Sequence, residues 1–166
     1  MILTNQEVYS LEPLWVTMDR EPGIDVVGRL SGKDLNHDGR VINLVIVGSS
    51  RYYDFSVIEQ AIEDWIEKEA HPDLVITGGA SGVDYLAERW ADNNNIPFAV
   101  FNEEWDSPRD GLEDSGRHEA STSLTDRLLS VATHILAFPS PTSKWTRIVI
   151  EKAEQREIPF SVVEVS

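Results

Sequence analysis

The sequence predicts a doubly wound α/β domain, in which helices cover both faces of a mostly parallel sheet. Short apolar runs alternate with helix-length amphipathic segments from residue 42 to residue 165, and this alternation is typical of a parallel sheet. The run INLVIV at 42–47 is apolar on both faces, as a central parallel strand requires. Three loops rich in Gly, Ser or Pro follow predicted strands, where such sheets bind their ligands.

The elements are expected in a regular order. The apolar runs predict strands at 42–47, 73–77, 97–101, 133–138 and 159–165. The amphipathic segments predict helices at about 56–69, 82–93, 118–131 and 145–156. Trp65 and Trp90 fall within two of these helices, and we expect both side chains to pack on the sheet.

The first forty residues are expected to form an extension to a domain at 41–166. Residues 1–23 show no sustained periodicity and predict an irregular arm. From residue 24, two β-rich runs joined by a Gly, Asn and Asp cluster predict a hairpin or an added edge strand. The cluster DLNHDGRV copies the first half of a calcium-binding loop, but Val45 stands where a bidentate Glu is required, so a turn is predicted and no metal site.

The charge of the chain disfavours nucleic acid as a partner. The sequence has 29 acidic and 14 basic side chains, a formal net charge of -15, and no basic run. A protein that binds nucleic acid gains most of its affinity from Lys and Arg that neutralise phosphates. The absence of cysteine excludes disulfides and thiolate metal sites. Because the sequence has neither a membrane-length apolar run nor a signal-peptide pattern at its start, we expect a cytoplasmic protein that does not enter membranes.

The loop TGGASGVD, which follows the strand ending at Thr77, indicates an anion site. Gly78 and Gly79 leave the backbone N–H groups uncovered, and Gly82 precedes a helix whose first N–H groups attract negative charge. The loop fits neither the dinucleotide fingerprint nor the Walker pattern. Phosphate is therefore the expected ligand of this loop, and a tight turn that binds no ligand is the alternative.

Taken together, the motifs GSSR, TGGASGVD followed by AERWA, the Arg-led GRHEA and the final Ser and Thr resemble the SLOG superfamily of Rossmann-like domains. Within it, residues 42–165 look like the YspA and YpsA-related branch, with relatives among DprA and LOG proteins. The resemblance implies the sheet order 3-2-1-4-5 and a pocket for a nucleotide or a nucleotide-derived molecule. The ligand-binding residues that it implies are Gly48, Ser49, Arg51, Asp54, Gly78, Gly79, Ala80, Gly82, Asp84, Arg117, His118, Ser143, Trp145 and Thr146.

Several positions depart from the family pattern or have two interpretations. Trp145 replaces a glycine, so its indole is expected either to cover the site or stack on a base, or else to pack against the N-terminal arm. His118 stands where Asn is usual, and it is either a general base or a residue that begins a helix. Asp54 is interpreted as a helix N-cap or as a ligand contact.

Hydrolysis of the ligand is the second function that the resemblance implies. LOG phosphoribohydrolases carry acidic residues after their second glycine motif, whereas this chain has apolar residues at 148–150. The remaining candidates for a catalytic carboxylate are Asp54, Asp84 and Glu119, of which Asp84 and Glu119 are preferred, and Asp84 could equally interact with the helix dipole.

Three functions therefore stand side by side: binding of a nucleotide-derived molecule as a sensor or sequestering module, N-glycosidic cleavage of nucleoside monophosphates, and single-strand binding, which the charge disfavours. Whether the chain is an enzyme is left open. No cofactor is implied, and self-association is left open because the exposed arm and helices of such folds often pair.

Overall fold

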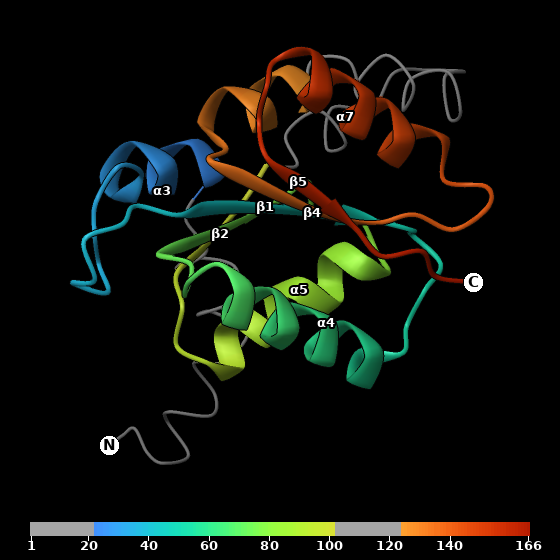
Figure 1. The fold of residues 1–166 in the computed structure, drawn as a ribbon, viewed down its shortest axis with the longest axis horizontal. Coiled ribbons are helices and arrows are strands. Elements are labelled where there is room, and N and C mark those ends of the chain that lie inside the picture. Colours follow the sequence, from blue (N-terminus) through green and yellow to red (C-terminus); the bar gives the residue numbers. More distant parts are fainter. Residues whose placement is uncertain (1–21, 102–123) are drawn as a thin grey trace, which may run out of the picture.

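The structure is a computed structural model that describes residues 22–101 and 124–166. Its centre is a parallel sheet of five strands in the order β3-β2-β1-β4-β5 (Figure 1). The strands are β1 (Asn43–Gly48), β2 (Leu74–Thr77), β3 (Phe98–Val100), β4 (His134–Phe138) and β5 (Phe160–Val162). The predicted fold class and sheet order are confirmed.

Helices cover both faces of this sheet. Helices α4 (Phe55–Lys68) and α5 (Val83–Asn93) lie on one face (Figure 1). Helices α3 (Gly23–Leu30) and α7 (Lys144–Gln155) lie on the other, together with the helical residues 124–131. Because every crossover between parallel strands must return to the same end of the sheet, this arrangement collects the loops after the strands at one edge.

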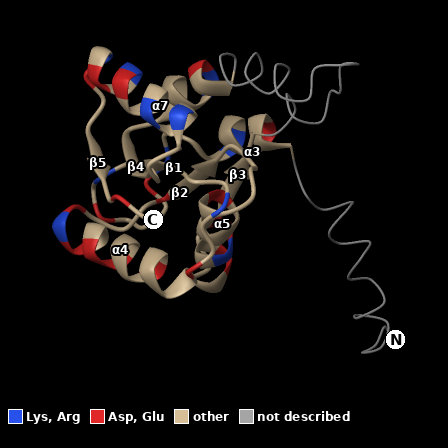
Figure 2. Ribbon diagram, turned by 90° about the vertical axis from the view of Figure 1, so that its right-hand side faces the viewer, with Lys and Arg blue, Asp and Glu red and all other residues tan. Residues whose placement is uncertain are grey.

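Two apolar cores follow from the alternation of side chains along the strands. Val45 and Val47 of β1 pack with α3 and α7 on one face, whereas Leu44 and Ile46 pack with α4 and α5 on the other. Trp65 and Trp90 belong to the second core, with exposed fractions of 5% and 2%, as predicted. The strands contain no Lys, Arg, Asp or Glu, and Figure 2 shows charged residues on the outer helices.

The predicted β-rich extension is wrong for residues 24–30, which are helical. In α3, Val26 and Val27 are buried in the same core as the sheet, and Leu30 packs against that core. These positions recur at helical spacing, so helix formation places all three on the apolar surface, and tertiary packing outweighs the β propensity of valine. The part of the extension at residues 1–21 lies outside the described residues.

The turn predicted at DLNHDGRV is confirmed. The carboxylate of Asp34 accepts hydrogen bonds from the N–H groups of Asp38 (3.1 Å) and Gly39 (2.8 Å). Asp73, which is 1% exposed, ties this turn to the sheet by accepting bonds from the N–H groups of Asn36 and Ile42. The buried carboxylate of Asp73 therefore holds the turn close to the start of β1.

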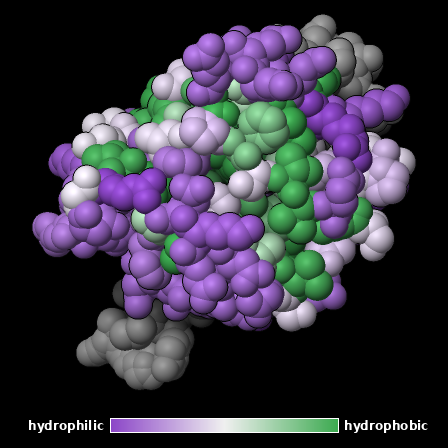
Figure 3. Space-filling view, viewed as in Figure 1, coloured by the Kyte–Doolittle hydropathy of each residue, from purple (hydrophilic) through white to green (hydrophobic). Residues whose placement is uncertain are grey.

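The edge of the sheet at β5 carries exposed apolar side chains. Phe160 and Val162 are 37% and 40% exposed. Figure 3 shows hydrophobic surface in this region, between the hydrophilic surfaces of the two helical layers. The chain beyond β5 continues the pairing with β4, because Val163 and Val165 donate to the carbonyls of Ala137 and Pro139.

Candidate functional site

Three loops meet at the carboxyl edge of the sheet: the first loop (49–54), the glycine loop (78–82) and the third loop (139–143). The N–H of Ser49 donates to the carbonyl of Phe138 at 3.0 Å, which joins the first loop to the end of β4. The N–H of Val83 donates to the carbonyl of Ser49 at 2.9 Å, and the hydroxyl of Ser81 donates to the carbonyl of Ser50 at 2.9 Å. The first loop therefore links the other two, at the edge that the sequence predicts.

The glycine loop depends on two backbone conformations that side chains disfavour. Gly79 and Gly82 have φ angles of 78° and 72°. A Cβ on Gly82 would overlap the backbone of Ser49 and Ser50. Gly82 is therefore required by the close packing of the two loops as well as by its own conformation.

The carboxylate of Asp84 is the anion that this loop holds in the folded chain. Its Oδ2 accepts hydrogen bonds from the N–H groups of Gly78 and Ala80, both at 3.2 Å, and the residue is 1% exposed. Asp84 also lies in the first turn of α5, where a negative charge interacts favourably with the helix dipole. The protein thus uses two of the loop's N–H groups for its own carboxylate.

The remaining N–H groups of the glycine loop belong to Gly79, Ser81 and Gly82. Within 22–101 and 124–166, none of these three N–H groups has a hydrogen-bond partner. Ser81 is exposed, and Gly79 is half-buried. Gly82 is buried against the first loop, so the accessible part of the glycine loop is 79–81, and the bonds from Gly78 and Ala80 to Asp84 fix its conformation.

Glu88 is a second carboxylate at this edge, and the sequence analysis did not single it out. It accepts a hydrogen bond at 2.8 Å from the hydroxyl of Thr77, the last residue of β2. Glu88 lies four residues after Asp84, so both side chains fall on one face of α5. This spacing was the signal in the sequence that could have indicated its position.

Trp145 covers the start of the glycine loop. Its Nε1–H donates to the hydroxyl of Thr125 at 2.7 Å, and its indole packs against the core. The indole Cη2 lies 3.6 Å from the place that a Cβ on Gly78 would occupy, and Leu124 Cδ2 lies 3.1 Å from it. A Cβ at Gly78 would therefore crowd Leu124 and only touch Trp145, and a role of the indole over a ligand stays a prediction.

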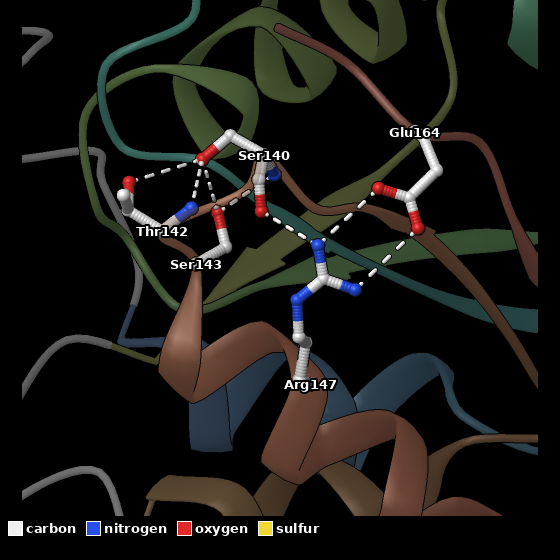
Figure 4. Close-up of polar contacts among 5 residues, drawn as sticks. All are labelled: Ser140, Thr142, Ser143, Arg147 and Glu164. Atoms are coloured by element: carbon white, nitrogen blue, oxygen red, sulfur yellow. Dashed lines mark hydrogen bonds and ion pairs between the residues drawn. The ribbon is translucent and has the colours of Figure 1, made fainter.

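The third loop carries a network of hydroxyl groups at the start of α7 (Figure 4). Ser143 occupies the N-cap position, and its Oγ accepts a bond from the N–H of Ser140 at 2.9 Å. The Oγ atoms of Ser140 and Ser143 are 3.0 Å apart, and Thr142 joins the same network. Thr146 is 2% exposed and lies in the first turn of α7.

Arg147 secures this network, although the sequence analysis did not single it out. It donates to the carbonyl of Ser140 at 2.8 Å and forms an ion pair with Glu164 at 3.2 Å (Figure 4). Because Arg147 follows Ser143 by four residues, helical spacing places it beside the loop. The third loop is thus fastened to the chain segment that follows β5.

The first loop presents an exposed cation. Arg51 is exposed, and its backbone N–H donates to the hydroxyl of Ser49, a residue that is 6% exposed. Asp54 stands at the N-cap position of α4, but its carboxylate accepts a bond from the hydroxyl of Ser56 at 2.8 Å and makes no capping bond to the helix N–H groups. Burial, together with the charge of Asp54, raises the pKa of Tyr52.

Three of the predicted site residues, Arg117, His118 and Glu119, lie outside the described residues. The structure places Gly48 at the end of β1 and the other predicted residues on the three loops or on the first turns of α5 and α7. Their role in binding a ligand stays a prediction. In the described ranges, no three His, Asp or Glu side chains gather as metal ligands would. No described helix has the length and apolar character needed to cross a membrane.

The fold and the three loops define a Rossmann-like α/β domain with its candidate site at the carboxyl edge of the sheet. Residues 42–107 match the family described as YspA, cpYpsA-related SLOG. The matched segment contains the first loop and the glycine loop, and the resemblance seen in the sequence is confirmed.

Among solved structures, the chain is similar to DNA processing protein A (DprA) from Streptococcus pneumoniae, with 15% identity and a TM-score of 0.57 over 76% of this chain. This likeness shows the fold, and the chain spans 51% of the DprA chain. A match to phosphoribosylglycinamide formyltransferase from Coxiella burnetii, solved with CHES, has 15% identity and a TM-score of 0.35. It covers 59% of this chain and 41% of that one, with a score too low to indicate a common fold. Comparison with curated proteins finds no match.

Proposed function

We propose that this protein binds a nucleotide or a nucleotide-derived small molecule at the edge where the three loops meet. A nucleotide-related role fits the SLOG family of the segment 42–107. The observation that carries the proposal is the hydrogen bonding of the Asp84 carboxylate to Gly78 and Ala80, because it indicates a loop whose backbone already accommodates one anion. The N–H groups of Gly79 and Ser81 are the donors proposed for the phosphate of the ligand.

Arg51 is the cation proposed to complete the site. The buried charge of Asp84 lies below the loop and repels a second anion, so the loop by itself is a weaker phosphate site than one without an internal carboxylate. A guanidinium beside the loop offsets this repulsion and offers two parallel donors to a phosphate. Arg51 lies next to Ser50, whose carbonyl accepts the bond from Ser81, so it is on the segment that contacts the glycine loop.

We propose binding rather than cleavage of the ligand. The carboxylates of Asp84 and Glu88 are bonded to the backbone of the glycine loop and to the hydroxyl of Thr77. A carboxylate that stabilises an oxocarbenium-like sugar must contact the substrate, and Asp84 is almost completely buried. The net charge of -15 also opposes nucleic acid, so a small anionic molecule is proposed as the ligand.

The test is calorimetry of the purified protein with AMP, ADP, ADP-ribose, NAD, ribose 5-phosphate and unphosphorylated adenosine. We expect binding of at least one phosphorylated compound and no binding of adenosine. Arg51→Gln should weaken that binding by about 10-fold or more, as expected for the loss of a charge-assisted contact. Lys33→Gln is the matched control, because it removes one exposed positive charge before β1, on another part of the chain.

Two results would count against the proposal. A folded protein that gives no heat with any phosphorylated compound would remove nucleotide binding altogether. Equal affinities for wild type, Arg51→Gln and Lys33→Gln would remove Arg51 from the site. Chromatography of the same mixtures for free base separates binding from cleavage, because release of base would show that the ligand is hydrolysed.

A further inference from the structure

Two contacts place the first loop beside the start of α5. At one end, the hydroxyl of Ser81 donates to the carbonyl of Ser50 at 2.9 Å. At the other end, the guanidinium carbon of Arg89 lies 4.6 Å from the ring centroid of Phe55. The segments 50–55 and 81–89 are therefore joined near both of their ends.

Two exposed tyrosines lie between the two contacts. Tyr53 is 57% exposed on the first segment, and Tyr85 is 51% exposed on the second. Tyr85 and Arg89 are four residues apart in α5, so both side chains lie on one face of the helix, and Arg89 contacts Phe55. Tyr52, by contrast, packs against the second core, between the sheet and helices α4 and α5.

The order of residues along both segments suits a ligand with an anion at one end and a planar ring at the other. Arg51 precedes Tyr53 by two residues, and Ser81 precedes Tyr85 by four residues. On both segments the group that suits an anion comes first and the aromatic ring follows. Exposed aromatic rings beside phosphate-binding groups are the usual means of holding a base without reading its identity.

We infer that Tyr53 and Tyr85 form a stacking surface for the base of the nucleotide whose phosphate meets Gly79 and Ser81. This inference rests on the proposed function and adds the part of the ligand that the loops do not explain. Because stacking recognises the face of a ring rather than its hydrogen-bonding edge, purine nucleotides, with the larger ring, bind more tightly than pyrimidine nucleotides here.

The test compares AMP with ribose 5-phosphate, which has the same sugar and phosphate but no base. Tyr53→Ala and Tyr85→Ala should each weaken AMP binding by about 5-fold to 100-fold, the range expected for the loss of one stacking contact. Binding of ribose 5-phosphate should stay within about 2-fold of the wild-type value, because no ring is lost from its contacts. Phe160→Ala is the matched control, because it removes an exposed aromatic ring from the β5 edge.

The outcomes distinguish this inference from the proposed function. If AMP binds and both tyrosine variants bind it as tightly as the Phe160→Ala control, the stacking surface is refuted and nucleotide binding stands. If the tyrosine variants lose AMP and ribose 5-phosphate to the same extent, the rings do not act through the base and the inference is again refuted. If wild type binds no nucleotide, both proposals fail together.

Discussion

Gly82 lies directly against the backbone of Ser49, and this contact holds the glycine loop to the first loop. A Cβ on Gly82 would overlap the carbonyl oxygen of Ser49, the atom that accepts the bond from the N–H of Val83. The φ and ψ angles of Gly82 are 72° and −128°, a combination that only glycine adopts readily. The candidate site is therefore built on a backbone contact that no other residue permits.

Gly82→Ala is expected to destabilise the fold by about 2–4 kcal/mol, because backbone strain adds to the overlap with Ser49. The measurement is the free energy of unfolding in urea. Gly28→Ala is the matched control, since a Cβ at Gly28 in α3 meets nothing within 4 Å. This control should gain about 0.5–1 kcal/mol, as alanine does in a helix. Equal stability of the two variants would contradict the role given to Gly82.

Asp84→Ala is expected to cost about 1–3 kcal/mol, because it removes the acceptor of two buried hydrogen bonds. Both N–H groups bond to the same atom, Oδ2. Asp84→Asn can place its amide oxygen there, so it should cost less than the alanine variant. Urea unfolding of the three proteins checks this ranking, and an asparagine variant less stable than the alanine variant would contradict it.

Asp73→Asn, unlike Asp84→Asn, is expected to lower the free energy of unfolding clearly. Asp73 uses both of its oxygens, Oδ1 toward the N–H of Asn36 and Oδ2 toward the N–H of Ile42. An asparagine must turn its NH₂ group toward one of these donors, at a cost of about 1–3 kcal/mol. Asp92→Asn, an exposed position in the last turn of α5, should leave the free energy of unfolding almost unchanged. If Asp73→Asn lowered the free energy of unfolding as little as Asp92→Asn, Asp73 would not organise the turn.

The stability of the protein is expected to fall in mild acid because of His134. Burial lowers the pKa of His134 from its usual 6.5, the charge of Glu69 raises it, and the charge of Arg40 lowers it. The ring also touches Trp65 edge-on, and its Nδ1 lies 2.9 Å from the hydroxyl of Thr133. Because the unfolded chain takes up this proton at a higher pH than the folded chain, unfolding becomes easier as the pH falls below about 6.5.

The check is the free energy of unfolding between pH 8 and pH 5 for wild type, His134→Gln and the exposed control His71→Gln. We expect the wild type and His71→Gln to lose more stability over this range than His134→Gln. Above about pH 7, His134 is neutral in the folded and the unfolded chain. Its titration should therefore not change the free energy of unfolding with pH in that range. Identical pH profiles for all three proteins would show that His134 has an ordinary pKa.

Much of the fold could be predicted because its signals are local. The apolar run of β1 and the stripe that contains Trp65 each identify one element, and the alternation of elements leaves few ways to build a parallel sheet. The helix α3 could not be predicted in this way, because Val26 and Val27 favour a strand locally. Only the apolar surface of the sheet makes the helix the better way to bury them.

The candidate site, like the fold, could be predicted from the sequence only in part. By itself, the sequence determined the strand order through the family resemblance, the edge at which the loops meet and the glycines that the backbone requires, since these depend on short-range geometry. Only the tertiary structure decided that the Asp84 carboxylate accepts bonds from the glycine loop, that the Trp145 indole donates to Thr125, and that Ser81 and Arg89 of one segment contact Ser50 and Phe55 of the other. Each of these contacts joins parts of the chain whose distance is set by packing between elements, and no local pattern in the residues encodes that distance.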